Sequence, residues 1–151
     1  MPEKTKEINA NADKSAQPPY RNENAANKNE SIPKIIHYIW LGGKPKPESV
    51  ENCIASWRKF CPDYQIMEWN ETNVDLNENL FVRQAVSAKK WAFASDVVRL
   101  FVLLEHGGIY MDTDMELFKP LDEFLDNPAF FSFENKYILG TAIIGSVKNN
   151  P

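Results

Sequence analysis

Two acidic residues separated by one position, Asp112 and Asp114, carry the clearest chemical signal in this sequence of 151 residues. In an extended backbone, residues i and i+2 point the same way, so the two carboxylates would lie side by side. Paired hard oxygens suit Mg²⁺ or Mn²⁺, and Mg²⁺ usually keeps positions for water and substrate phosphates. The spacing therefore predicts a divalent-cation site that also binds a phosphorylated ligand.

The sequence around this pair narrows its interpretation. An isolated Asp-x-Asp is weak evidence, because charged residues make up about a quarter of a typical chain. An EF-hand calcium loop opening at Asp112 is excluded, since its sixth position must be glycine and is Leu117 here. The pair directly follows Gly-Gly-Ile-Tyr-Met, which is typical of a turn and a short strand. This context favours a metal that binds substrate over a solvated surface loop.

A second polar group, Asp96 and Arg99, lies within the most apolar segment of the chain, with Ser95 four residues before Arg99. In a helix, Asp96 and Arg99 share one face. They could form an intrahelical ion pair that contributes a few tenths of a kcal/mol. Because burying charge is costly unless it is paired, they could instead line a polar cleft that binds a ligand. Both interpretations remain open from the sequence.

An aromatic residue, Trp40, ends an apolar run and is followed by two glycines. Tryptophan at such a place is either a core residue or a platform for a ligand. His37 is expected to be a hydrogen-bonded strand residue, and His106 a helix-end residue favoured by the helix dipole. Cys53 and Cys61 lack the spacing of zinc ligands, so we expect two reduced thiols.

Strands and helices alternate along the part of the chain that must position these residues. Apolar and β-branched runs predict strands at 32–41, 64–69, 109–111, 129–133 and 141–144. Helical spacing predicts helices at 48–60, 81–87 and 89–106, with one helical turn at 121–125. The helix at 89–106 is apolar on most of its circumference, so we expect it to be packed inside the domain. The alternation predicts an α/β fold with a mostly parallel sheet and ligands at the carboxyl ends of its strands.

Composition predicts one domain, at 32–151, preceded by a disordered polar tail at 1–31. The five basic and five acidic residues of 1–31 cancel, so the net charge of −4 comes from 32–151 and disfavours nucleic acid as a partner. No secretory signal and no membrane-spanning helix are expected. These features favour a cytoplasmic protein, and they leave open a peripheral association with the inner face of the membrane.

Three segments taken together resemble the DXD-motif sugar transferase family: IPKIIHYIWLGG at 32–43, ASDVVR at 94–99 and GGIYMDTD at 107–114. This glycosyltransferase family 32-like group includes α-1,6-mannosyltransferases and bacterial capsule and lipopolysaccharide glycosyltransferases. More distantly, the segments are similar to the glucosyltransferase domain of large clostridial toxins. The resemblance extends from residue 32 to about residue 147, with the motifs in consistent order and spacing.

The resemblance implies a GT-A fold that uses a nucleotide-diphospho-sugar and retains the anomeric configuration. By position, Trp40 matches the aromatic that stacks on the donor base, and Asp96 and Arg99 match residues that hold the donor sugar and phosphates. Asp112 matches the carboxylate near the ribose and the metal, and Asp114 the carboxylate that ligates Mn²⁺ or Mg²⁺ directly. Asp112 and Asp114 are therefore the expected catalytic centre. A UDP-sugar is favoured over a GDP-sugar as donor.

The expected function is transfer of a hexose to a saccharide acceptor during synthesis of cell-surface polysaccharide, such as capsule or lipopolysaccharide. Family members continue past the position of Pro151 with acceptor-binding elements, so the chain is expected to be truncated at its C-terminus and weak in transfer. Two alternatives remain: a non-catalytic nucleotide-sugar-binding module, and a toxin-like enzyme that glycosylates a protein.

Overall fold

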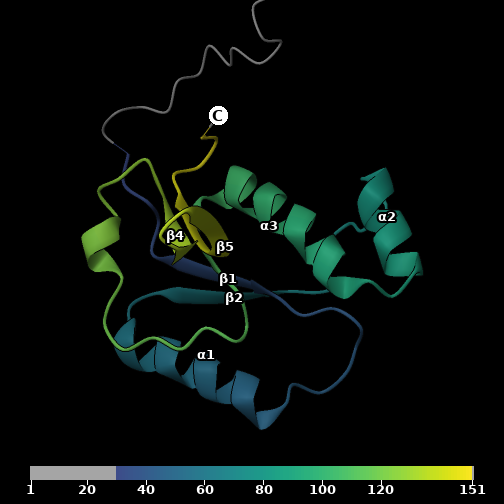
Figure 1. Cartoon of the computed structure of the whole chain (residues 1–151), viewed down its shortest axis with the longest axis horizontal. Coiled ribbons are helices and arrows are strands. Elements are labelled where there is room, and N and C mark those ends of the chain that lie inside the picture. The colour runs from purple at the N-terminus through teal and green to yellow at the C-terminus, as the bar shows by residue number, and fades with distance from the viewer. Residues whose placement is uncertain (1–29, 151) are drawn as a thin grey trace, which may run out of the picture.

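The computed structural model describes residues 30–150, and the predicted polar tail at 1–31 falls almost entirely outside them. The elements follow in the order β1 (Ile35–Ile39), α1 (Glu48–Phe60), β2 (Gln65–Trp69), α2 (Leu80–Ser87), α3 (Trp91–His106), β3 (Gly108–Met111), a 3₁₀ turn (Asp122–Phe124), β4 (Ala129–Asn135) and β5 (Ile138–Ser146) (Figure 1). Over residues 30–150, no helix has the length and apolar character needed to span a bilayer.

The five strands form one sheet in the order β2-β1-β3-β5-β4. Strand β1 pairs in parallel with β2 and with β3, whereas β5 runs antiparallel to β3 and to β4. Four of the five strands therefore share one direction, and only β5 opposes it. The predicted α/β class with a mostly parallel sheet is confirmed.

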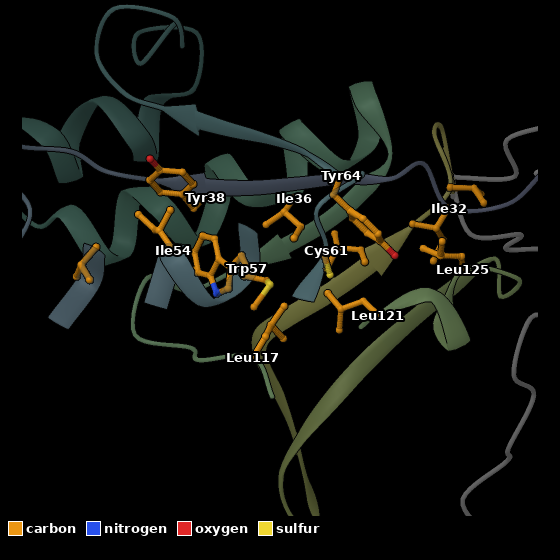
Figure 2. Close-up of a cluster of buried hydrophobic side chains, with 14 residues drawn as sticks. Ile32, Ile36, Tyr38, Ile54, Trp57, Cys61, Tyr64, Leu117, Leu121 and Leu125 are labelled. Atoms are coloured by element: carbon orange, nitrogen blue, oxygen red, sulfur yellow. The ribbon is translucent and has the colours of Figure 1, made fainter. Parts of the chain in front are cut away.

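Helices cover both faces of the sheet, with α1 on one face and α2 and α3 on the other (Figure 1). Strand β3 contributes to both resulting cores, because successive side chains of a strand point to opposite faces. Ile109 and Met111 pack into the cluster on the α1 side, which also holds Ile54 and Trp57 (Figure 2). Tyr110 packs on the α3 side. Asp112 therefore follows a strand that is buried on both faces.

Helix α3 is less enclosed than the sequence predicts. It buries one stripe against the sheet and α2, which includes Ala94, Val98, Val102 and Leu103. Its other apolar side chains are about half exposed: Phe93, Leu100, Phe101 and Leu104. The expectation that this helix is packed inside the domain is therefore wrong, because a helix lying on a sheet buries only the side that faces it.

The start of β3 is fixed by a buried histidine on β1. Trp69 donates its indole N–H to Nδ1 of His37 at 3.0 Å, so Nε2 carries the ring proton and donates to the carbonyl of Gly107 at 2.8 Å. Gly107 and Gly108 have φ of +65° and +99°, in the left-handed region that favours glycine. The prediction of a hydrogen-bonded strand histidine is confirmed. The contact joins β1, β2 and the turn that leads into β3.

The remaining predictions for individual residues concern His106 and the cysteines. His106 is the last residue of α3, as predicted, and its ring stacks on Trp69 with centroids 5.1 Å apart. Cys53 is half-buried and Cys61 is buried, and both are free thiols. Burial raises the pKa of both thiols, which keeps them protonated and unreactive.

Candidate functional site

An open pocket of about 560 Å³ lies beyond the carboxyl ends of β1 and β3, beside the first turns of α3. The five residues predicted from the sequence all line it: Trp40, Asp96, Arg99, Asp112 and Asp114. Strands β1 and β3 are parallel neighbours, so the loops that follow them meet at one edge of the sheet. The topology thus brings together residues that lie up to 74 positions apart, from 40 to 114.

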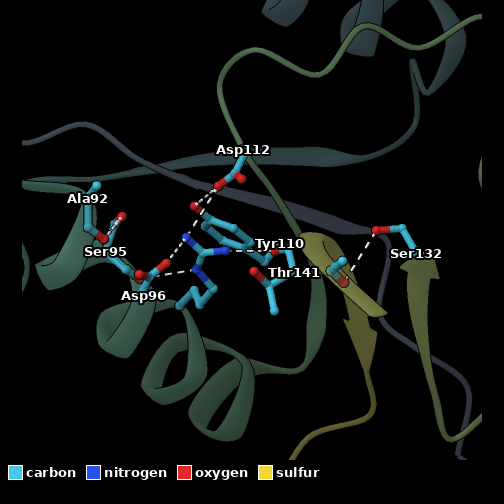
Figure 3. A network of polar contacts seen from close by, with 9 residues as sticks. Ala92, Ser95, Asp96, Tyr110, Asp112, Ser132 and Thr141 are labelled. Atoms are coloured by element: carbon cyan, nitrogen blue, oxygen red, sulfur yellow. Dashed lines mark hydrogen bonds and ion pairs between the residues drawn. The ribbon is translucent and has the colours of Figure 1, made fainter. Parts of the chain in front are cut away.

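Arg99 is the centre of the polar contacts in this pocket, although its side chain is buried. Its Nη2 donates to Oδ1 of Asp96 at 2.6 Å, and its Nη1 donates to the carbonyl of Thr141 on β5 at 2.7 Å. The guanidinium also lies over the ring of Tyr110, 4.4 Å from the centroid. Figure 3 shows this network between α3 and the sheet. The arginine is therefore held in place by the protein before any ligand binds.

Asp96 and Arg99 form the intrahelical ion pair, and both residues also line the pocket. The Arg99 side chain is 6% exposed, whereas the Asp96 side chain is 54% exposed. The ion pair is therefore only partly exposed, because Arg99 lies inside the wall of the pocket. Asp96 is oriented by Arg99 and keeps a carboxylate surface that faces solvent in the pocket.

Asp112 is held by two partners at one oxygen. Tyr110 donates its phenolic O–H to Oδ1 at 2.7 Å, and Nη2 of Arg99 lies 3.4 Å from the same oxygen. Burial raises the pKa of Asp112, and the negative charges of Asp114 and Asp96 raise it further. The contacts with Tyr110 and Arg99 lower this pKa but do not cancel the rise. Among residues 30–150, both contacts use Oδ1, so Oδ2 is left for a ligand.

Asp114 lies in a turn and not in an extended segment. Strand β3 ends at Met111, and the backbone N–H of Met115 donates to the carbonyl of Asp112 at 3.1 Å. The prediction of two carboxylates aligned by an extended backbone is therefore wrong. The chain leaves the sheet at Asp112, and the turn exposes Asp114 at the same pocket.

These carboxylates fit Mg²⁺ or Mn²⁺ through the chemistry of their donor atoms. Asp112 and Asp114 offer hard oxygens in one pocket, and a cation would offset the burial and repulsion that raise the pKa of Asp112. Over residues 30–150, no group of three or more His, Cys, Asp or Glu side chains is placed to hold a metal. A metal bound here would complete its coordination with water or with phosphate oxygens of a ligand.

Trp40 lies between the core and the pocket. Its ring packs partly against the core on the α1 side and also lines the pocket. Its indole N–H donates to the carbonyl of Lys44 at 2.7 Å. The ring is therefore fixed at the boundary between core and pocket.

The further residues that line the pocket include three large side chains that were not predicted from the sequence: Lys44, Trp91 and Tyr110. Tyr110 had a usable signal, because residues two apart at a strand end share one face and Tyr110 precedes Asp112 by two. Lys44 lies in a Pro-rich connector and Trp91 at the start of a helix. Neither position carries a local signal, since the tertiary fold alone brings them to the pocket.

The sheet, with carboxylates following a central strand, has a GT-A-type fold. Residues 47–131 match the family described as "Glycosyltransferase sugar-binding region containing DXD motif", over more than half of the 151 residues. The chain belongs to this DXD glycosyltransferase family, as the three sequence motifs predict.

Two curated yeast relatives and one solved structure are similar to the chain. Inositol phosphoceramide mannosyltransferase 3 of Schizosaccharomyces pombe is 29% identical over 136 residues, which cover 87% of this chain and 38% of that protein. Mannosyl phosphorylinositol ceramide synthase SUR1 of Saccharomyces cerevisiae is 28% identical, with 86% and 35% covered. The structure titled PaToxG Glycosyltransferase superposes with a TM-score of 0.64 at 24% identity, covering 81% of this chain and 56% of that chain. The chain spans less than two fifths of the length of the two curated relatives.

Proposed function

We propose that this chain binds a nucleotide-diphospho-sugar through a divalent cation and serves as the donor-binding part of a retaining glycosyltransferase. The observation that carries the proposal is the shared pocket of Asp112 and Asp114 with Trp40 and Asp96. One end of such a ligand is an aromatic base, the middle is a charged diphosphate, and the other end is a hydroxylated sugar. The pocket offers an aromatic ring, metal-binding carboxylates and a further exposed carboxylate for these three parts.

Each residue has a role that follows from its environment. Asp114 is exposed and would ligate the metal directly, while Oδ2 of Asp112 would face the metal and the ribose. Asp96 would accept hydrogen bonds from hydroxyls of the donor sugar. Arg99 orients both Asp96 and Asp112, and its charge balances part of their repulsion. Trp40 would stack on the base.

The chemistry depends on charge that develops on the leaving group. The bound cation would neutralise the diphosphate as the bond to the anomeric carbon breaks. The residues of the chain orient the donor for this step and keep its sugar and phosphates in fixed relation. Retention of configuration is part of the proposal and rests on the family resemblance, which implies that the acceptor hydroxyl attacks from the face that the diphosphate leaves.

For the donor we propose a UDP-sugar, with a GDP-sugar as the competing choice. For the acceptor we propose a saccharide of a cell-surface glycoconjugate. The names of two relatives refer to inositol phosphoceramide, so a glycolipid that bears phosphoinositol belongs in the same acceptor panel.

Calorimetry tests the donor site. UDP-glucose, UDP-galactose, UDP-N-acetylglucosamine and GDP-mannose are titrated with Mn²⁺ and, separately, with a chelator. Asp114→Asn removes a ligand charge at constant volume, so we expect it to abolish metal-dependent binding and to leave the fold intact. Asp126→Asn, at an exposed position outside the pocket, is the matched control. Equal binding of Mn²⁺ and donor by Asp114→Asn and the parent would refute the metal assignment.

Transfer is tested separately from binding. Radiolabelled donor is incubated with each acceptor, and labelled product and free sugar are counted. A chain that binds donor but yields neither product would fit the alternative of a non-catalytic nucleotide-sugar-binding module.

A further inference from the structure

The four tryptophans of the chain differ in what their indole N–H groups contact. Three of them donate to a protein acceptor at distances of 2.7 to 3.0 Å: Trp40, Trp57 and Trp69. Among residues 30–150, Trp91 has no such acceptor, although its side chain is half-buried and lines the donor pocket. A tryptophan N–H usually has a hydrogen-bond partner when it is buried. The Nε1 atom of Trp91 is not one of the buried side-chain atoms without a partner, so its N–H is accessible and can donate to an acceptor outside the protein.

A glycine in the loop after β1 lies close to the Trp91 ring. Trp91 is the first residue of α3, and Gly42 lies in the loop that follows β1. A Cβ atom at Gly42 would lie 3.0 Å from both Cε2 and Nε1 of Trp91. The part of the indole around Cε2 and Nε1 therefore lies close to Gly42. A side chain at Gly42 would make the indole shift by a few tenths of an ångström.

We propose that Trp91 binds the nucleotide sugar by donating a hydrogen bond from its indole N–H to an oxygen of that ligand. The inference rests on the proposed function, because it assumes that a nucleotide sugar occupies this pocket. Trp91 comes from α3 and Trp40 from the end of β1, so two aromatic side chains from different elements border the ligand. Gly42 has a positioning role, since it keeps the Trp91 ring where the ligand can reach its N–H.

Two substitutions separate the hydrogen bond from the shape of the pocket. Trp91→Phe keeps an aromatic ring and removes the N–H, and we expect donor affinity to fall about fivefold, as for the loss of one neutral hydrogen bond. Gly42→Ala keeps the N–H and displaces the ring, and we expect a loss of affinity at least as large.

Gly43→Ala is the matched control for Gly42→Ala. Both glycines have positive φ, +97° at Gly42 and +63° at Gly43, so alanine strains the backbone at either position. A Cβ at Gly43 meets nothing within 4 Å, whereas at Gly42 it meets Trp91. We therefore expect Gly43→Ala to bind donor like the parent, with thermal unfolding used to correct for any loss of folded protein.

Calorimetry with UDP and with the tightest-binding UDP-sugar, in Mn²⁺, gives the result. A fall in affinity of Trp91→Phe for both ligands places the contact on the nucleotide, and a fall for the UDP-sugar alone places it on the sugar. If the parent binds donor and Trp91→Phe and Gly42→Ala bind it equally well, the inference is overturned while the proposed function stands. If the parent binds no nucleotide sugar, the proposed function itself fails.

Discussion

The phenolic hydroxyl of Tyr110 donates a hydrogen bond of 2.7 Å to Oδ1 of Asp112, two residues further along the chain. The Tyr110 ring is buried on the α3 side of the sheet, and the guanidinium of Arg99 lies over it. The first carboxylate of the DXD motif is thus oriented by a residue of the strand that precedes it. Such preorganisation means that the carboxylate needs little rearrangement when a ligand binds.

Replacing Tyr110 by phenylalanine removes this hydrogen bond and keeps the ring. We expect the free energy of unfolding to fall by about 1 kcal/mol. Metal-dependent donor binding should weaken several-fold, because Asp112 loses the contact that fixes its orientation. Denaturant unfolding and calorimetry measure the two effects. Tyr137→Phe, at a highly exposed tyrosine, is the control, and the prediction is wrong if both variants bind donor like the parent.

Replacing Lys44 by glutamine removes a positive charge from a pocket whose other charged residues are three aspartates and the buried Arg99. We expect weaker binding of UDP, because the diphosphate loses an attractive charge. The dependence of affinity on salt should also become less steep, since exposed charges are screened by ions. Calorimetry at two NaCl concentrations measures both effects. Lys136→Gln, in the β4–β5 hairpin away from the pocket, should leave both unchanged.

Acid should destabilise the domain through His37. Burial lowers the pKa of His37 to about 4, and the nearby His106 adds to this effect. The hydrogen bond to Gly107 acts in the opposite direction. An unfolded histidine has a pKa of about 6.5. Between these two pKa values the unfolded state binds more protons than the folded state. The contribution of His37 to the free energy of unfolding is therefore complete above about pH 6.5 and is lost as the pH falls towards 4. The loss is at most about 1.4 kcal/mol per pH unit.

Urea unfolding of the parent and of His37→Gln between pH 7 and pH 4.5 measures this contribution. The variant lacks the titrating ring, so its free energy of unfolding should be lower at pH 7 but should fall less steeply with acid. Other groups titrate in both proteins and cancel in the comparison. Equal slopes for the two proteins would show that His37 does not carry the acid sensitivity.

Replacing Gly108 by alanine should be severely destabilising. Its φ is +99°, and a Cβ there would lie 2.8 Å from both Nε2 of His37 and the carbonyl oxygen of Ile35. We expect the free energy of unfolding to fall by well more than the backbone strain alone would cause, which is about 1–2 kcal/mol for a left-handed residue. Gly43→Ala carries the strain without the steric clash and is the control. The two free energies of unfolding are compared by chemical denaturation, and a similar loss in both would contradict the steric explanation.

The predictions from sequence were accurate where the signal is local. Helix α1 has the predicted bounds of 48–60, because its apolar spacing is clear and Pro62 follows its end. The DXD pair could be placed at a strand end, since a glycine turn and an apolar run precede it. The exposure of Leu100 on α3 could not be predicted, because it depends on which side of the helix the sheet covers.

The same distinction holds within the site. Asp112 and Asp114 carry a motif, but the turn that begins after Asp112 is set by where β3 stops pairing with its neighbours. Trp91 and Lys44 lie 47 positions apart, and their place in one pocket results from the parallel pairing of β1 and β3. Pairings of this kind are not visible in a local pattern.

The central position of β1 and β3 has a consequence for the thermodynamics of ligand binding. Each has a strand on both sides, so their amide protons should exchange with solvent only through the largest openings of the domain. The pocket residues therefore extend from the most protected part of the sheet. On ligand binding, the loop after β1 and the turn at Asp114 would lose conformational entropy, whereas the strands that support them would lose little.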